Sequence, residues 1–257
     1  MSSGYSVRSP HPHERLLRDT AWLGRHNRMV HGLLELDVTE PRRAIATREE
    51  GTDDRLSFTA FLATCLAEAI GRHPTMQAYR NWRGDHVLFD DVDVMVMIET
   101  GDDDRRVPVA HVLRAANDRS VVALHREIRS VQRGASEPGD RRLVDLFTKL
   151  PGPVRRLGYR LVRARPQLWK RFGGTVALTA VGMFGEGGGW AIPIANHSLG
   201  LTVGGIAERP RAIDGEVEIR EVLDVTISVD HSIVEGAPAT RFAGTFRELV
   251  EGGYGLE

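Results

Sequence analysis

Helical and extended hydrophobic patterns alternate along most of this 257-residue chain, and this order constrains its fold more than any other feature. Apolar residues recur at helical spacing after Ser57, whereas valine-rich runs such as 92–98 and 107–113 are typical of strands. The C-terminal half adds further extended segments before a closing helix over 237–250. The order predicts an α/β fold of mixed α+β character, with one central mixed sheet flanked by helices.

The individual elements can be bounded from the same patterns. Strands are expected at 33–38, 87–89, 92–98, 107–113, 176–181, 199–206, 216–219 and 224–229. Helices are expected at 40–50, from a cap at Ser57 or Thr59 to Gly71, at 120–133, at 237–250, and in proline-divided pieces over 141–171.

Length and composition suit one soluble domain. We expect a flexible N-terminus over 1–14 and a single catalytic domain over 15–257, with an inserted basic helical segment at 139–171. Lys and Arg number 34 against 35 Asp and Glu, so no global charge attracts nucleic acid or an anionic membrane. Cys65 is the single cysteine, which excludes an intrachain disulfide and suggests a small buried hydrophobic residue. No apolar leader is visible, so a cytoplasmic location is expected.

One histidine stands where the predicted elements would expose it. His231 follows the expected strand 224–229 and Asp230, and the closing helix begins a few residues later. Histidine titrates near neutrality, so a side chain at this place can take a proton from a hydroxyl or thiol and return it. Judged alone, a histidine between a strand and a helix is more often structural.

Several ordered motifs resemble those of a known family. Asp230-His231-x-x-x-Glu235-Gly236-Ala237 is similar to the active-site signature of the 2-oxoacid dehydrogenase acyltransferases, the E2 catalytic domain, whose fold and motif chloramphenicol acetyltransferase shares. The segment 174–185 resembles that family's strand and glycine turn, and further similarities run over roughly residues 15–253. The resemblance implies a fold like that of chloramphenicol acetyltransferase.

The resemblance also implies roles for particular residues. His231 matches the catalytic base, and Thr179 matches the hydroxyl residue that donates a hydrogen bond to the tetrahedral oxyanion. Glu235 stands where the family usually has Asp, and it would orient the loop by pairing with Arg15. Asp230 and Gly236 would support the site. The candidate substrate-binding residues are Trp190, Asn196 and Phe184.

The ligands and partners follow from the same resemblance. It implies a coenzyme A thioester, most simply acetyl-CoA, as co-substrate, with direct attack of the acceptor and no metal ion. It also implies a homotrimer in which one subunit gives the histidine and its neighbour the hydroxyl. No spacing among the other histidines is typical of metal ligands.

Three features that differ from a dehydrogenase core decide which acceptor we expect. No lipoyl domain is visible, residues 139–171 exceed the usual link, and the turn at 183–190 is rich in glycine. These features resemble stand-alone O-acetyltransferases of tetronate polyketide biosynthesis, so we expect O-acetylation of a small hydroxyl compound. The alternatives are an E2 core acting on lipoyl groups supplied by another chain, and a non-catalytic trimeric scaffold.

Two further segments have competing interpretations. The run Arg141–Arg171 holds ten basic residues and reads as a solvated helix face, with docking of an acidic carrier protein or of coenzyme A phosphates as the alternative. The run Gly187–Gly189 lacks the lysine and hydroxyl residue of a phosphate loop, so we expect it to serve turn geometry.

Overall fold

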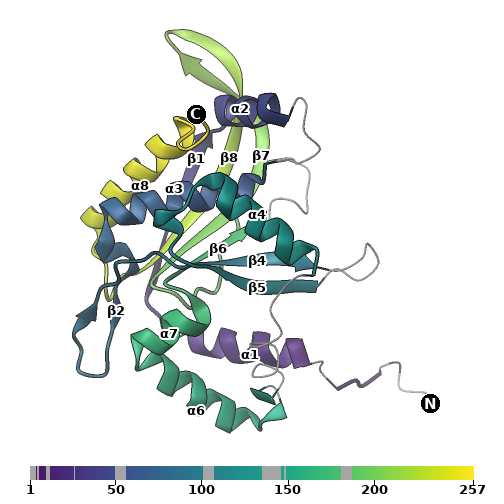
Figure 1. Ribbon diagram of the computed structural model, residues 1–257, viewed down its shortest axis with the longest axis vertical. Coiled ribbons are helices and arrows are strands. Elements are labelled where there is room, and N and C mark those ends of the chain that lie inside the picture. The colour runs from purple at the N-terminus through teal and green to yellow at the C-terminus, as the bar shows by residue number, and fades with distance from the viewer. Residues whose placement is uncertain are drawn as a thin grey trace.

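The chain folds around one six-stranded mixed sheet (Figure 1). The computed structural model describes residues 4, 6–9, 12–25, 27–49, 56–100, 107–134, 146–147, 149–180 and 187–257. The sheet order is β1-β8-β7-β6-β4-β5. Strands β6 and β7 pair in parallel, as do β4 and β6, and the remaining neighbours pair antiparallel. The predicted mixed sheet flanked by helices is confirmed.

The described elements have the following bounds. The strands are β1 (Met29–Asp37), β2 (Tyr79–Arg80), β3 (His86–Val87), β4 (Val94–Thr100), β5 (Val107–Leu113), β6 (Val176–Ala180), β7 (Leu199–Ile213) and β8 (Glu216–Asp230). The helices are α1 (Pro12–Gly24), α2 (Thr39–Glu49), α3 (Phe58–Arg72), α4 (Val121–Gln132), α6 (Gly152–Arg163), α7 (Pro166–Gly173) and α8 (Gly236–Glu251).

Helix α3 forms the centre of the main core, because α4 and α8 both pack against it. Of the two predicted caps, Ser57 and Thr59, it is Ser57 that caps the helix, accepting a hydrogen bond from the Ala60 N–H at 3.4 Å. Ten of its residues are buried, Cys65 among them, and burial raises the pKa of the Cys65 thiol. Figure 1 shows α1, α6 and α7 gathered away from this core, at the opposite end of the sheet.

The long ribbon β7–β8 corrects the sequence prediction. The segments expected at 216–219 and 224–229 form one strand, and β7 continues to Ile213. Asp214 and Gly215 have positive φ angles of 50° and 90° and join the strands tightly. The prediction missed residues 207–213 of β7 and 220–223 of β8. The outer part of the ribbon projects beyond the core (Figure 1), and Pro210 and the charged residues of 207–213 weaken the hydrophobic pattern there.

A small hairpin, β2–β3, also differs from expectation. The strand expected at 87–89 is limited to His86–Val87, which pairs with Tyr79–Arg80. Two-residue strands are too short to produce a periodic signal, so the sequence does not reveal this pairing.

The basic segment is not simply a solvated face. The Arg155 side chain is 4% exposed, and its Nε lies 2.6 Å from the Asp19 carboxylate on α1. On the outer side of the same helix, α6, the apolar residues Val154, Leu157 and Leu161 are 49% to 61% exposed. The prediction is therefore wrong for Arg155, because a local charge pattern does not reveal a distant acidic partner.

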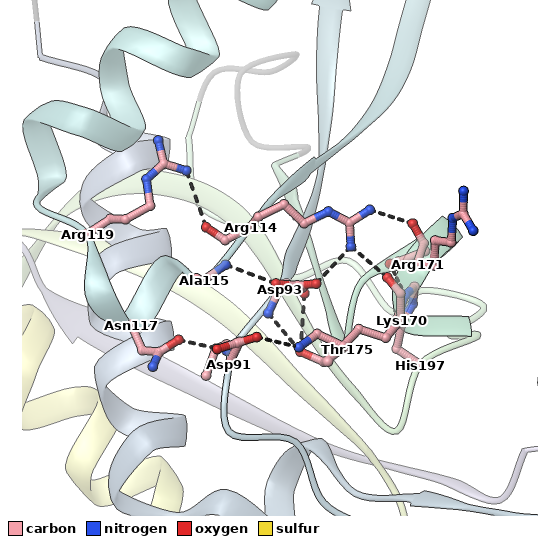
Figure 2. A network of polar contacts seen from close by, with 12 residues as sticks. Asp91, Asp93, Arg114, Ala115, Asn117, Arg119, Lys170, Arg171, Thr175 and His197 are labelled. Carbon is pink, nitrogen blue, oxygen red and sulfur yellow. Dashed lines mark hydrogen bonds and ion pairs between the residues drawn. The ribbon is translucent and has the colours of Figure 1, made fainter. Parts of the chain in front are cut away.

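A buried carboxylate connects α7 to the start of β6 (Figure 2). Asp93 accepts hydrogen bonds from Arg114 at 2.8 Å and from the Ala115 N–H at 2.9 Å. Arg114 also donates to main-chain oxygens at the end of α7, and the Thr175 N–H donates to the Asp93 carbonyl at 2.7 Å. Gly174 has φ +74°, and a Cβ there would lie 2.6 Å from the Asp93 carbonyl oxygen. This network sets the position of β6, the strand that carries Thr179.

Candidate active site

The main chain holds His231 on both sides while its side chain is left exposed. Its N–H donates to the Arg28 carbonyl at 2.8 Å, and the preceding Asp230 N–H donates to the Ser198 carbonyl at 2.9 Å. The histidine therefore stands at the end of β8, between the start of β1 and the start of β7. A rigid support with an exposed ring suits a group that must meet an incoming ligand.

Asp230 shapes the loop that follows. The residue is 4% exposed, and its Oδ1 accepts hydrogen bonds from the Ser232 N–H at 3.0 Å and the Ser232 hydroxyl at 2.7 Å. Its carbonyl accepts from the N–H groups of Ile233 and Val234. Asp230 thus acts on His231 through the backbone of the turn.

Two arginines that the sequence did not identify as site residues lie near this loop. Arg80 of β2 donates through Nη2 to the Ser232 carbonyl at 2.6 Å. Arg163 of α6 donates to the side chain of Asn27 and to the Leu23 carbonyl. Burial lowers the Arg163 pKa, while the nearby Asp230 charge opposes that shift. Both lie far from His231 in sequence, so no local pattern reveals them.

The predicted pair of Glu235 and Arg15 is not among the contacts of the described residues. Glu235 is the exposed residue before α8, and its side chain makes no capping hydrogen bond. Arg15 is partly buried in α1. Gly236 begins α8, where a Cβ would meet no atom within 4 Å. The roles expected for these three residues stay predictions.

Thr179 and His231 are far apart within one chain. Thr179 pairs with Thr202 of β7, which pairs with Thr226 of β8. His231 follows Thr226 by five residues, and β8 is two strands from β6. A rise of ~3.4 Å per residue and a strand spacing of ~4.8 Å give a separation of roughly 20 Å. One chain alone does not bring the two predicted catalytic groups together.

The candidate substrate-binding residues lie in different surroundings. The Trp190 indole N–H donates to the Leu34 carbonyl at 3.0 Å, and the Arg209 guanidinium lies 5.6 Å from the centre of its ring. The Asn196 amide oxygen is buried beside Gly24. Phe184 lies outside the described residues.

The glycine run next to Trp190 packs backbone against backbone. The Gly189 N–H donates to the Asp224 carboxylate at 2.6 Å, and the Gly205 N–H donates to the Gly189 carbonyl at 3.0 Å. A Cβ at Gly204 would collide with the Gly189 carbonyl oxygen, and one at Gly205 with that of Gly187. These glycines therefore permit a close approach of two chain segments, which agrees with a role in turn geometry.

Other histidines have structural partners. His197 is buried, donates through Nε2 to the Gly173 carbonyl at 2.8 Å, and burial lowers its pKa to about 4. His111 lies 2.6 Å from Glu127. Within the part of the chain that the structure describes, no cluster of His, Cys, Asp or Glu could hold a metal ion. Among the same residues, no helix has the length and apolar character needed to cross a membrane.

A protein-family model matches the C-terminal part of the chain. Residues 165–255 match the family model described as 2-oxoacid dehydrogenases acyltransferase (catalytic domain). This segment holds Thr179, His231 and Glu235.

Curated relatives cover a larger part of the chain. It is 25% identical over 219 residues to the dihydrolipoyllysine-residue acetyltransferase component of the pyruvate dehydrogenase complex of Rickettsia felis, a match over 84% of this chain and 44% of that protein. It is 24% identical to the lipoamide acyltransferase component of the branched-chain alpha-keto acid dehydrogenase complex of Bacillus subtilis, over 85% of this chain and 46% of that one. The chain thus spans about half the length of these relatives.

Solved structures show the same fold over almost the whole chain. A probable dihydrolipoamide acetyltransferase from Listeria monocytogenes superimposes with a TM-score of 0.72 at 18% identity, covering 98% of this chain and 97% of that one. A chloramphenicol acetyltransferase gives a TM-score of 0.51 at 15% identity, covering 98% and 99%. The chain has the fold that E2 catalytic domains share with chloramphenicol acetyltransferase, and its residues 165–255 match the catalytic domain of the 2-oxoacid dehydrogenase acyltransferases.

Proposed function

We propose that this protein transfers an acyl group between coenzyme A and a thiol or hydroxyl acceptor, with His231 as general base. The observation that carries the proposal is the placement of His231, held by main-chain hydrogen bonds at a strand end with its ring exposed. The fold and the family match over 165–255 support the same reaction class.

The reaction needs no covalent enzyme intermediate. His231 takes the proton from the acceptor as its sulfur or oxygen attacks the thioester carbonyl carbon. The resulting tetrahedral oxyanion accepts a hydrogen bond from the Thr179 hydroxyl, a contribution worth about 3 kcal/mol when such a donor is pre-aimed. The carbon–sulfur bond to coenzyme A then breaks, and the leaving thiolate takes the proton back from His231.

We further propose that His231 and Thr179 meet between two copies of the chain in a homotrimer. Their separation within one chain supports this, because neither reaches the other. Strand β1 is one of the two edge strands of the sheet, and its Val30 and Leu33 are exposed by 47% and 52%. Ile192 and Ile194 are exposed by 64% and 67%, in a segment tied to the β1 region by the bonds from Trp190 to Leu34 and from Asn27 to Ala195. Apolar groups on an open strand edge favour pairing with another chain.

The acceptor that the comparisons favour is a dihydrolipoyl group carried by another chain. The matched relatives are named as dihydrolipoyllysine-residue and lipoamide acyltransferases. The glycine-rich turn that suggested a hydroxymethyl tetronate has a packing explanation at Gly187–Gly189. That turn therefore gives no preference for a hydroxyl acceptor, and the lipoyl alternative becomes the main proposal.

The test measures free coenzyme A released from acetyl-, succinyl- and isobutyryl-CoA by the full chain. Each donor is offered with dihydrolipoamide and, separately, with a panel of hydroxyl compounds that includes hydroxymethyl tetronates. The variants are His231→Ala and the matched control His111→Gln, which alters a histidine on another edge of the sheet.

The proposal predicts turnover with dihydrolipoamide, lost by at least about a hundredfold in His231→Ala and kept in the control. Turnover with a hydroxyl compound alone would replace the lipoyl acceptor with an O-acyltransferase. No turnover with any pair would favour the non-catalytic scaffold.

A further inference from the structure

The small hairpin β2–β3 reaches the catalytic loop through a single charged side chain. Arg80 belongs to this hairpin, yet its guanidinium Nη2 lies 2.6 Å from the carbonyl oxygen of Ser232, 152 residues further along the chain. Ser232 directly follows His231. One of the five N–H donors of the guanidinium makes this contact, which lies at the surface between two exposed residues.

The base of the hairpin is firmly anchored, which makes Arg80 a suitable support. The neighbouring Tyr79 is 6% exposed, and its hydroxyl donates to the Thr175 carbonyl at 2.8 Å. The Trp169 indole N–H donates to the same hydroxyl at 3.1 Å. Since side chains alternate along a strand, Tyr79 points into the core and Arg80 points to the opposite side, toward the loop.

The other hydrogen bonds of the loop hold its N–H groups, and Arg80 holds one of its carbonyl groups. Asp230 binds the N–H groups of residues 232 to 234, and the Arg28 carbonyl binds that of His231. These contacts restrain N–H groups, whereas Arg80 is the described partner of the Ser232 carbonyl. Without it, the peptide between Ser232 and Ile233 is held only at its N–H, by the Asp230 carbonyl, and the turn that carries His231 is less restrained.

We infer that Arg80 is the positioning residue of the catalytic loop, acting on His231 through the Ser232 carbonyl. The resemblance assigned a supporting contact of this loop to Arg15, and that role stays a separate prediction. The expected effect of Arg80 on the rate rests on the proposed function. Its expected effect on the order of the loop rests on the contact geometry alone.

The experiment compares Arg80→Ala with Arg83→Ala, the matched control in the same hairpin. The Arg83 guanidinium lies 4.8 Å from the centre of the exposed Trp82 ring, and among the described residues it makes no hydrogen bond or ion pair with the loop. Hydrogen–deuterium exchange is followed in peptides covering 228–242. We expect exchange of the loop amides to rise about tenfold in Arg80→Ala and to stay at the wild-type rate in Arg83→Ala.

The kinetic arm uses the donor and acceptor pair that the wild-type protein turns over. Arg80→Ala is expected to lower kcat about tenfold with KM for the acyl-CoA changed less than threefold, and millimolar ethylguanidine is expected to restore part of kcat. Rescue by a small guanidinium separates loss of positioning from misfolding.

The two arms separate the two proposals. Wild-type loop exchange in Arg80→Ala would overturn the positioning role, whatever the activity. If the loop amides of Arg80→Ala exchange faster but the wild-type protein shows no turnover, the positioning role holds and the proposed function is wrong. Unchanged kcat despite faster exchange would also overturn the positioning role of Arg80, because the order of the loop would then not affect the rate.

Discussion

At the scale of single residues, burial decides which histidines can do chemistry. His231 is exposed at a strand end, whereas His197 is buried against Gly173 and the Trp169 ring. Burial lowers the pKa of His197 to about 4, so it stays neutral at physiological pH and serves as a hydrogen-bond donor. The same side chain is thus exposed at one position and a buried hydrogen-bond donor at the other.

His197 should make stability depend on pH in a defined window. Its pKa is about 4 when folded and about 6.5 when unfolded, so between these values the unfolded chain binds a proton that the folded chain does not. Its contribution is complete above pH ~6.5 and falls by roughly 3 kcal/mol as the pH drops toward 4. Urea unfolding of His197→Gln should show a smaller loss of stability across this window than wild type. An identical pH slope in both proteins would contradict the assignment.

At the scale of elements, a buried ion pair holds helix α6 against α1. Arg155 on α6 binds Asp19 on α1 at 2.6 Å, while the neighbouring Arg156 lies 3.6 Å from the same carboxylate and is 39% exposed. Removing one partner of a buried pair leaves an uncompensated charge. The two arginines should therefore differ sharply in their contribution.

Arg155→Met should lower the free energy of unfolding by about 3 to 5 kcal/mol, and Arg156→Met by less than about 1 kcal/mol. Chemical denaturation of both variants measures the difference. Equal effects would mean that Asp19 does not distinguish between them.

Gly204 on β7 lies against the backbone of the run Gly187–Gly189. Gly204→Ala should lower the Tm by roughly 5 to 10 °C, because its methyl group would collide with the Gly189 carbonyl oxygen. Gly200 on the same strand has open space at its Cβ, so Gly200→Ala is the matched control and should leave Tm nearly unchanged. A comparable loss in both variants would show that strand propensity, not the close approach, sets the effect.

At the scale of the whole molecule, the sequence predicted the core and missed the parts that depend on distant partners. The cap at Ser57, the mixed sheet and the strand 107–113 follow from patterns carried by a few adjacent residues. The outer half of the β7–β8 ribbon and the hairpin β2–β3 lack such a pattern, because the former is mostly exposed and the strands of the latter are two residues long. Arg80 and Arg155 were missed because each is defined by a partner more than a hundred residues away.

The sheet as a whole also sets the distance between the two proposed catalytic groups. Thr179 and His231 are roughly 20 Å apart in one chain by the strand register. The proposed mechanism therefore requires two copies, with the histidine of one facing the hydroxyl of the next.

The most direct test of this account mixes two variants, His231→Ala and Thr179→Ala, each expected to be at least about a hundredfold less active than wild type. Differently tagged chains are refolded together at equal amounts, mixed trimers are verified by native mass spectrometry, and release of coenzyme A is measured with the wild-type substrate pair. If each site draws its histidine and its hydroxyl from different copies, random mixing restores both groups in about a quarter of the sites, and activity recovers to about a quarter of wild type. Activity that stays at the level of the single variants, although mixed trimers are present, would contradict a site shared between chains.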